Sequence, residues 1–360
     1  ASGLIALGSF AFADTDTRPD THAGAGTGTP TGTYAAPDPD GRSGLVVPEV
    51  VVGHRGGHWW VTTVAAEARI PPQPPALRAA ADVTSPGTLG FADGALTTAE
   101  WEGIVAEAVR RIGGGSLDKV VLARDLDVRA EHPIDARWVL RRLATRYPSC
   151  YTYAVDGLLG ATPELLIRLE GRLATSRVLA GTIRRTGSRA RDEARAGSLA
   201  RSSKDLEEHE YAVASVASAL GPHCTALNVP ESPFVLHLPN VMHLATEVTG
   251  VVDDDSSALT LAAALHPSAA VCGTPRELAA DTIAELEGMG RGRWAGPVGW
   301  LSADGDGEWG IALRGGLLDR ADPRRVRLIA GCGIVAGSDP GEELAETNAK
   351  FVPMRDALAD

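Results

Sequence analysis

Apolar residues recur at helical spacing in several segments of the chain. From Trp101 to Val109 they fall on every third or fourth position, and Thr97 with Glu100 just before them has the form of a helix-start capping box. This helix is expected to end at Gly113. The same spacing predicts further helices at residues 77–81, 134–147, 205–220, 258–265, 275–286 and 340–358.

Runs of β-branched and apolar residues predict strands between these helices. The longest run covers 119–128 and is apolar on both faces, as in a strand that is buried on two sides. Further strands are predicted at residues 3–8, 46–52, 59–64, 151–155, 165–169, 298–301, 309–318 and 326–330. Segments predicted as loops from their Gly and Pro content are 23–43, 71–75 and 85–93. Strands in hairpin-like succession with irregularly placed helices favour an α+β fold with mostly antiparallel sheets.

The composition is that of a globular protein, and its net charge disfavours some classes of binding partner. The 360 residues are 44% hydrophobic and carry a net charge of −12, which disfavours nucleic acid and anionic membranes as partners. No apolar run approaches the ~20 residues that span a bilayer. The four cysteines, at 150, 224, 272 and 332, are far apart in sequence, which favours free thiols in a reducing, cytoplasmic compartment.

Acidic residues mark the start of the last predicted helix. Asp339 and Glu342 fit the N-cap and N3 positions of a capping box. Glu343 and Glu346 project from one face of that helix, with Lys350 one turn further on. The spacing alone fits either a binding site or a solvated face with a Glu346–Lys350 ion pair.

A second acidic pair, Asp205 and Glu208, lies in the first turn of another predicted helix, which Ser202 is placed to cap. First-turn acids suit the positive end of a helix dipole, so this pair alone indicates only a helix start. Carboxylates from two distant segments could also share a hard cation, because Mg²⁺ prefers a few carboxylates together with water and a substrate oxygen.

Two further ionisable residues lie in apolar surroundings. Lys119 begins the strand at 119–128, where burial would favour a neutral amine that can act as a base. The alternative interpretation is that Lys119 lies at the end of the strand and reaches solvent. Glu164 lies between a turn-forming Thr-Pro and an apolar run, and a partly desolvated carboxyl group has a raised pKa and can donate a proton. The alternative for Glu164 is an ordinary loop glutamate.

The glycine-rich segment 330–337 is similar to a dinucleotide-binding fingerprint. Such a turn opens directly into a helix within a βαβ unit, whereas here several residues intervene and only the last helix follows. Nucleotide binding is therefore disfavoured. Backbone N–H groups exposed by these glycines could still hold a carboxylate.

Nine short motifs between residues 97 and 360 resemble, in the same order, those of the chorismate-utilising enzymes, which include isochorismate, salicylate, anthranilate and aminodeoxychorismate synthases. The motifs are Lys-Val-Val-Leu-Ala-Arg at 119–124, Thr-Pro-Glu-Leu-Leu at 162–166, Leu-Ala-Gly-Thr at 179–182, Lys-Asp-x-x-Glu-His at 204–209, Met-His-Leu-Ala-Thr at 242–246, Leu-His-Pro at 265–267, Gly-Glu-Trp-x-x-x-Leu-Arg at 307–314, Ala-Gly-x-Gly-Ile at 330–334 and Glu-x-x-Glu-Thr at 343–347. Residues 1–96 match loosely and are expected to form a variable N-terminal portion of the same domain, with the chorismate-binding catalytic region at 97–360.

The resemblance implies a single α+β domain with two large antiparallel sheets packed face to face and helices outside. It implies Mg²⁺ held by Glu208, Glu343 and Glu346, with Asp205 nearby, and bridging to the ring carboxylate of chorismate. The substrate-binding residues that it implies are Gly181, Thr182, His243, Ala270, Arg314, Gly331, Gly333 and Lys350. His266, in the Leu-His-Pro motif, is expected to be structural.

Two positions separate the reactions of this family. Ammonia-using members carry Gln where this chain has Lys119, so the lysine resembles the water-using branch. In that branch Lys119 would deprotonate the water that attacks C2, and Glu164 would protonate the hydroxyl that leaves from C4. Ala270 stands near a position where lyase-active relatives tend to have Thr, which favours an enzyme that stops at isochorismate. Val271 and Cys332 depart from the common Leu and Ala and leave salicylate formation open.

The sequence therefore predicts a monomeric, magnesium-dependent isochorismate synthase, an isomerase that acts on chorismate for siderophore, menaquinone or salicylate-type biosynthesis. A salicylate synthase with the same first step is the nearest alternative, and an aminating synthase is more distant. A non-catalytic protein that binds chorismate or metal is the third alternative. It is disfavoured because the set Lys119, Glu164, Glu208, Glu343 and Glu346 is complete.

Overall fold

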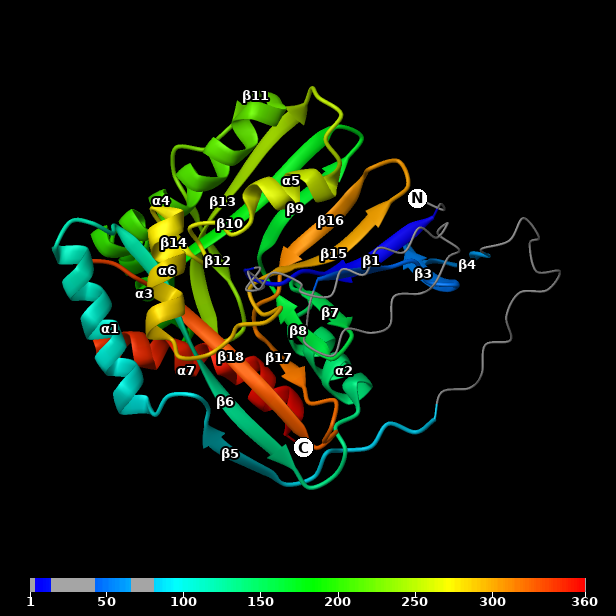
Figure 1. The fold of residues 1–360 in the computed structure, drawn as a ribbon, viewed down its shortest axis with the longest axis horizontal. Helices are drawn as coiled ribbons and strands as arrows, with labels where there is room; N and C mark the ends of the chain where they lie inside the picture. Colours follow the sequence, from blue (N-terminus) through cyan, green and yellow to red (C-terminus); the bar gives the residue numbers. More distant parts are fainter. Residues whose placement is uncertain (1–3, 14–42, 66–80, 360) are drawn as a thin grey trace, which may run out of the picture.

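The computed structural model describes residues 4–13, 43–65 and 81–359. The loops expected at 23–43 and 71–75 and the helix expected at 77–81 fall almost entirely outside the described residues. Two large antiparallel sheets dominate the described part, with helices on their outer sides (Figure 1). The α+β fold that the sequence predicts is confirmed.

The first sheet has nine strands, each antiparallel to its neighbours. In spatial order they are β11 (Cys224–Asn228), β13 (Val241–Val252), β10 (Leu173–Arg184), β9 (Leu165–Glu170), β16 (Gly307–Ile311), β15 (Pro297–Ser302), β1 (Ile5–Ser9) and β2 (Gly44–Val46), with β12 (Phe234–His237) also paired to β13. The N-terminal strand thus lies in the same sheet as strands from the second half of the chain.

The second sheet has seven strands and is also antiparallel. In spatial order they are β14 (Gly273–Thr274), β6 (Lys119–Ala130), β18 (Arg325–Ile334), β17 (Gly315–Leu318), β8 (Leu158–Thr162) and β7 (Tyr151–Val155), with β5 (Leu89–Asp93) also paired to β6. A separate hairpin consists of β3 (Val50–Arg55) and β4 (His58–Thr63).

Seven α-helices cover the sheets of the described part. They are α1 (Thr98–Gly113), α2 (Ala136–Arg146), α3 (Arg189–Leu199), α4 (Ser203–Leu220), α5 (Ala258–Leu265), α6 (Arg276–Leu286) and α7 (Pro340–Leu358). Helix α4 packs on β10 and β13, α7 packs on β18, and α6 packs on β6. No helix within residues 4–13, 43–65 and 81–359 has the length and apolar composition needed to cross a bilayer.

Local helix-start signals agree with the structure in most places. Thr97 and Glu100 exchange both hydrogen bonds of a capping box at α1, and Ser202 Oγ accepts a hydrogen bond from the Asp205 backbone at α4. At α7, Asp339 accepts from the Glu342 backbone N–H. The return bond from the Glu342 side chain is absent among the described contacts, so the expected capping box is only half formed.

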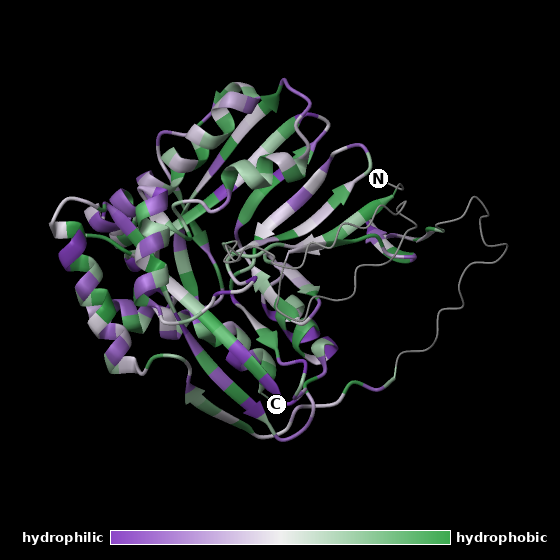
Figure 2. Ribbon diagram, in the orientation of Figure 1, coloured by the Kyte–Doolittle hydropathy of each residue, from purple (hydrophilic) through white to green (hydrophobic). Residues whose placement is uncertain are grey.

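One hydrophobic cluster contains buried residues from both sheets, including Val120 of β6, Ile167 of β9 and Trp309 of β16. Figure 2 shows hydrophobic residues along the strands of both sheets, while hydrophobic and hydrophilic residues alternate around α1. This cluster also includes the apolar side of α1, and a second cluster lies between the second sheet and helices α2 and α7. The four cysteines are free thiols, as predicted.

Several expectations about strands were wrong. The single strand expected at 309–318 is two strands, because β16 and β17 belong to different sheets and the chain crosses between them at Arg314, whose φ is 51°. The strand expected at 46–52 is likewise divided between β2 in the first sheet and β3 in the separate hairpin. The segment 85–93, expected as a loop, contains β5, which pairs with the distant β6.

Six strands were not predicted, since their pattern becomes clear only when partner strands define their faces. They are β8, β10, β11, β12, β13 and β14.

Beside the middle of β6, side chains form the hydrogen bonds that a neighbouring strand would otherwise make. On that edge β14 pairs with the first residues of β6 and β5 with its last five, which leaves the backbone between them without a strand. Glu287 accepts a hydrogen bond from the Ala123 N–H at 2.7 Å, and Arg291 donates to the Val121 and Val271 carbonyls at 2.7 and 2.8 Å. Glu287 and Arg291 are themselves ion-paired, and both are buried.

We predict that Glu287→Leu destabilises the protein by about 3–5 kcal/mol, because it leaves the buried Arg291 guanidinium without a counter-charge. The measurement is the free energy of unfolding from chemical denaturation. Glu285→Leu is the matched control on the same helix, since the exposed Glu285 pairs with Arg111 in contact with solvent, and little change is expected there. Equal losses for the two variants would contradict the assignment of β6 support to Glu287.

Candidate active site

A cavity opens between the two sheets, with walls from β10 and β13 on one side and β6 and β18 on the other. Ten of the fourteen residues predicted for the site line it: Glu164, Gly181, Thr182, Glu208, His243, Ala270, Arg314, Gly331, Gly333 and Lys350. The other four, Lys119, Asp205, Glu343 and Glu346, are not among the lining residues, although Lys119 and Glu346 form ion pairs with the lining residues Glu208 and Lys350. Segments spread over nearly 190 residues thus meet in one place.

Lys119 is the first residue of β6, and its side chain is fully buried. Its Nζ lies 3.4 Å from Glu208 Oε1 and 3.4 Å from the Glu208 carbonyl oxygen. The alternative of a lysine reaching solvent is therefore wrong. A Cβ on Gly333 would approach Glu208 Oε1 to 2.1 Å and Lys119 Cε to 2.9 Å, so only glycine leaves room for this pair.

Glu164 lies in the turn between β8 and β9, with a backbone N–H that donates to Thr162 Oγ1 at 3.2 Å. The side chain is 5% exposed. Burial raises the pKa of Glu164 to about 8, although the positive charges of Lys119, Lys350 and Arg314 act in the opposite direction. The carboxyl group is therefore protonated at neutral pH and can donate a proton into the cavity.

His243 connects Arg314 to Thr182 across the first sheet. Arg314 Nη2 donates to His243 Nε2 at 2.9 Å, and a guanidinium can only donate, so Nε2 carries no proton. Burial, with the charge of Arg314, holds the pKa of His243 well below its usual range. The ring proton is thus on Nδ1, which donates to Thr182 Oγ1 at 3.1 Å. The Thr182 hydroxyl then keeps its own hydrogen for a ligand.

Arg314 carries a positive charge that the protein does not neutralise by direct pairing. It is 8% exposed, and among the described residues it forms no ion pair with a carboxylate. Its backbone is in the left-handed region, and the Tyr153 hydroxyl donates to the neighbouring Leu313 carbonyl at 2.9 Å. A buried guanidinium on a cavity wall suits an anionic group of a ligand.

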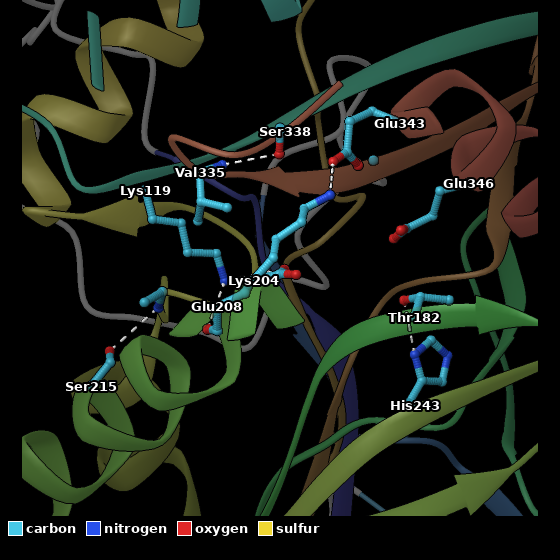
Figure 3. A network of polar contacts seen from close by, with 12 residues as sticks. Lys119, Thr182, Lys204, Glu208, Ser215, His243, Val335, Ser338, Glu343 and Glu346 are labelled. Atoms are coloured by element: carbon cyan, nitrogen blue, oxygen red, sulfur yellow. Dashed lines mark hydrogen bonds and ion pairs between the residues drawn. The ribbon is translucent and has the colours of Figure 1, made fainter. Parts of the chain in front are cut away.

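Each glutamate expected to hold a metal is paired with a lysine. Lys204 Nζ lies 2.5 Å from Glu343 Oε1 (Figure 3). Lys350 Nζ lies 2.6 Å from Glu346 Oε1. The Glu346–Lys350 ion pair of the alternative interpretation is therefore present. The face is not solvated, however, because Glu343 is 1% exposed. Burial raises the pKa of Glu343, and the negative charge of Glu346 adds to this effect.

The four acids fit a divalent cation in chemistry but are not gathered around one point. In the part of the chain that the structure describes, no three His, Cys, Asp or Glu side chains lie close enough together to hold a metal ion. Carboxylates are nevertheless the ligands that Mg²⁺ prefers. Burial also raises the pKa of Asp205, and the charge of Glu208 adds to it, a repulsion that a bound cation would relieve.

Two glycines of the site have different roles: Gly181 is required by the space available, and Gly331 supplies a backbone acceptor. Gly181 has a φ of 73°, and a Cβ there would approach the Asp205 side chain to 2.9 Å. Gly331 accepts a hydrogen bond from Lys350 Nζ on its carbonyl at 2.8 Å. The segment around Gly331 and Gly333 is the end of β18, and α7 begins only at Pro340, so no helix opens directly from these glycines as a dinucleotide site requires.

Lys204 is the site residue that the sequence analysis missed. It belongs to the Lys-Asp-x-x-Glu-His motif, yet no role was predicted for it. The available signal was composition, because the 34 basic residues include only three lysines, at 119, 204 and 350. All three lie at this site.

Comparison with known proteins gives the same family throughout. The model of the chorismate binding enzyme family matches residues 78–359. Isochorismate synthase DhbC of Bacillus subtilis is 42% identical over 266 residues, which are 71% of this chain and 66% of that protein. The putative isochorismate synthase MenF of Mycobacterium tuberculosis is 42% identical over 256 residues, 68% of each protein. The chain thus spans about two thirds of the length of these relatives.

Solved structures agree in fold over nearly the whole chain. The putative 2,3-dihydroxybenzoate-specific isochorismate synthase DhbC of Bacillus anthracis superposes with a TM-score of 0.77 at 33% identity, covering 99% of this chain and 84% of that one. The menaquinone-specific isochorismate synthase MenF of Escherichia coli gives a TM-score of 0.75 at 25% identity, with coverages of 99% and 79%. The chain belongs to the chorismate-binding enzyme family.

Proposed function

We propose that this protein is an isochorismate synthase, which uses water to move a hydroxyl group of chorismate from C4 to C2. Two features of one site carry this proposal: a buried lysine that contacts the cavity residue Glu208, and a buried glutamate with a raised pKa that lines the same cavity. Lys119 is held against Glu208, and Glu164 has a pKa raised by burial to about 8. Relatives that are 42% identical are named as isochorismate synthases, which supports the choice of substrate.

Lys119 is assigned as the base. In this role its amine takes a proton from water as the water oxygen attacks C2 of the ring. The ammonium that forms lies 3.4 Å from the Glu208 carboxylate, which stabilises the new charge. The absence of Gln at this position separates the protein from ammonia-using members.

Glu164 is assigned as the acid. As the new bond forms at C2, both ring double bonds shift by one position and the bond from C4 to its hydroxyl breaks. Glu164 gives its proton to the departing oxygen, which leaves as water. One water enters and one leaves, and the proton gained by Lys119 balances the proton lost by Glu164. After each turnover, loss of a proton by Lys119 and gain of a proton by Glu164 restore the starting protonation states.

The remaining residues are assigned to binding. Arg314 suits a substrate carboxylate, since its charge has no acidic partner, and the Thr182 hydroxyl is available to donate a hydrogen bond. Glu208, Glu343 and Glu346 would hold Mg²⁺, with Asp205 nearby. When bound, Mg²⁺ neutralises negative charge on the ring carboxylate.

The catalytic region is assigned to 97–360, and residues 1–96 to the same domain. Pairing of β1 with β15 supports this assignment, since the N-terminal strand completes the first sheet. The small Ala270 on the cavity wall supports an enzyme that stops at isochorismate.

Incubation with chorismate and Mg²⁺ is expected to yield isochorismate in chromatographic product analysis, and EDTA is expected to abolish turnover until Mg²⁺ is restored. Salicylate as the main product would favour the salicylate synthase instead. A requirement for ammonium would favour an aminating synthase. Chorismate binding without any product would contradict enzymatic function altogether.

We predict that Lys119→Gln and Glu164→Gln each lower kcat by about 10²–10⁴-fold, the usual effect of removing a base or an acid. The measurement is steady-state turnover of chorismate with both Mg²⁺ and ammonium present. Glu170→Gln, at the exposed end of β9, is the control and should keep wild-type rates. Retained or ammonium-driven activity in Lys119→Gln would refute the role of Lys119 as the base for water.

The pH profile is expected to report the proton on Glu164. The carboxyl group donates when protonated, so kcat/KM should fall as the pH rises through about 8. Profiles of kcat/KM for chorismate against pH test this. The residual rate of Glu164→Gln should lack the alkaline fall, because the amide does not ionise. An unchanged fall in that variant would assign the ionisation to another group.

A further inference from the structure

The distribution of lysine in this chain is unusual. Of 34 basic residues, 31 are arginine and three are lysine. Surface ion pairs such as Arg168–Glu308 and Arg177–Glu247 are made by arginine. Lysine is retained only where its amine meets a site glutamate. A lysine ammonium is a compact charge on a flexible stem, whereas the guanidinium is a planar fork that fixes its partner. The site therefore uses a property that arginine lacks.

Lys204 differs from the other two lysines in how it is held. Lys119 and Lys350 each contact a backbone carbonyl besides a glutamate, those of Glu208 and Gly331. Among the described contacts the Lys204 amine has one partner, Glu343. Its side chain is 29% exposed, against 0% and 15% for Lys119 and Lys350. Lys204 can thus leave its partner and reach solvent without abandoning a second bond.

The position of Lys204 in its helix is electrostatically unfavourable for a positively charged side chain. Lys204 is the second residue of α4, which begins at Ser203, and the N-terminal turn of a helix carries partial positive charge. The amine is held there by carboxylates. Those that act on it electrostatically are Glu343, then Glu346, then Glu208. These are the three glutamates that the proposed function assigns to Mg²⁺.

We propose that Lys204 is the resident counter-cation of the metal site: its ammonium neutralises the glutamates in the metal-free protein and must leave Glu343 for Mg²⁺ to bind. This inference rests on the proposed metal ligands. An ammonium 2.5 Å from Glu343 Oε1 repels a divalent ion that approaches the same carboxylate, so the two cations compete for Glu343. Lys204 thereby keeps four neighbouring acids compatible with folding and lowers the affinity for Mg²⁺.

Calorimetric titration with Mg²⁺ alone tests the competition. Lys204→Met keeps the length of the side chain but removes its charge, and it should lower the Kd for Mg²⁺ by about tenfold, the scale of one well-formed ion pair. Lys204→Arg keeps the charge and should not tighten binding. Arg185→Met removes one positive charge from an ion pair with Asp192 and should leave the Kd within twofold of wild type. An unchanged or raised Kd in a folded Lys204→Met protein would overturn the proposal.

A second measurement follows Lys204 directly in the wild-type protein. Lysine labelled with ¹³C at Cε gives three signals, because the chain has three lysines, and Lys204→Met identifies one of them. Titration with Mg²⁺ should move the Lys204 signal to the position of a solvated amine. Mg²⁺ binding in calorimetry with an unmoved Lys204 signal would overturn this proposal alone. No Mg²⁺ binding by wild type would overturn the metal assignment and this inference together.

Discussion

Charge buried between two sheets has to be neutralised by charge from elsewhere in the chain, and this requirement organises the site. Burying an unpaired ion is costly, so each glutamate of the cluster meets a lysine from another element or from the next turn of its own helix. Lys119 of β6 meets Glu208 of α4, and Lys204 of α4 meets Glu343 of α7. The ion pairs thus hold a strand and two helices in one arrangement.

The same cavity gives its ionisable groups different environments. Burial raises the pKa of Glu164, which has no direct ion pair among the described residues, whereas Glu208 pairs with Lys119. Burial, together with the charge of Arg314, lowers the pKa of His243, and the tautomer of its ring follows from the contact with Arg314. Proton donors, acceptors and fixed charges are therefore separated by local packing, although they share one small space.

Sequence reasoning succeeded where the signal is local. The bounds of α7 follow from its cap, its Pro340 and its periodicity, and eight of the ten cavity residues lie within the ordered motifs. It failed where the cause is a distant partner. The break at Arg314 between two sheets, and the support of β6 by Glu287, appear only once strands have neighbours. Side-chain pairing such as that of Lys204 has no fixed spacing along the chain.

The place of β1 has a consequence for how the chain acquires its structure. Ile5 pairs with Ser302, and Arg293 donates to Ser9 Oγ at 2.8 Å, so the N-terminal strand waits for residues almost 300 positions away. Closing so long a loop is slow, and during synthesis β1 has no β15 to pair with until residue 302 has been made. During this interval the edge of β1 that β15 later covers is open to pairing with other chains, which creates a risk of aggregation.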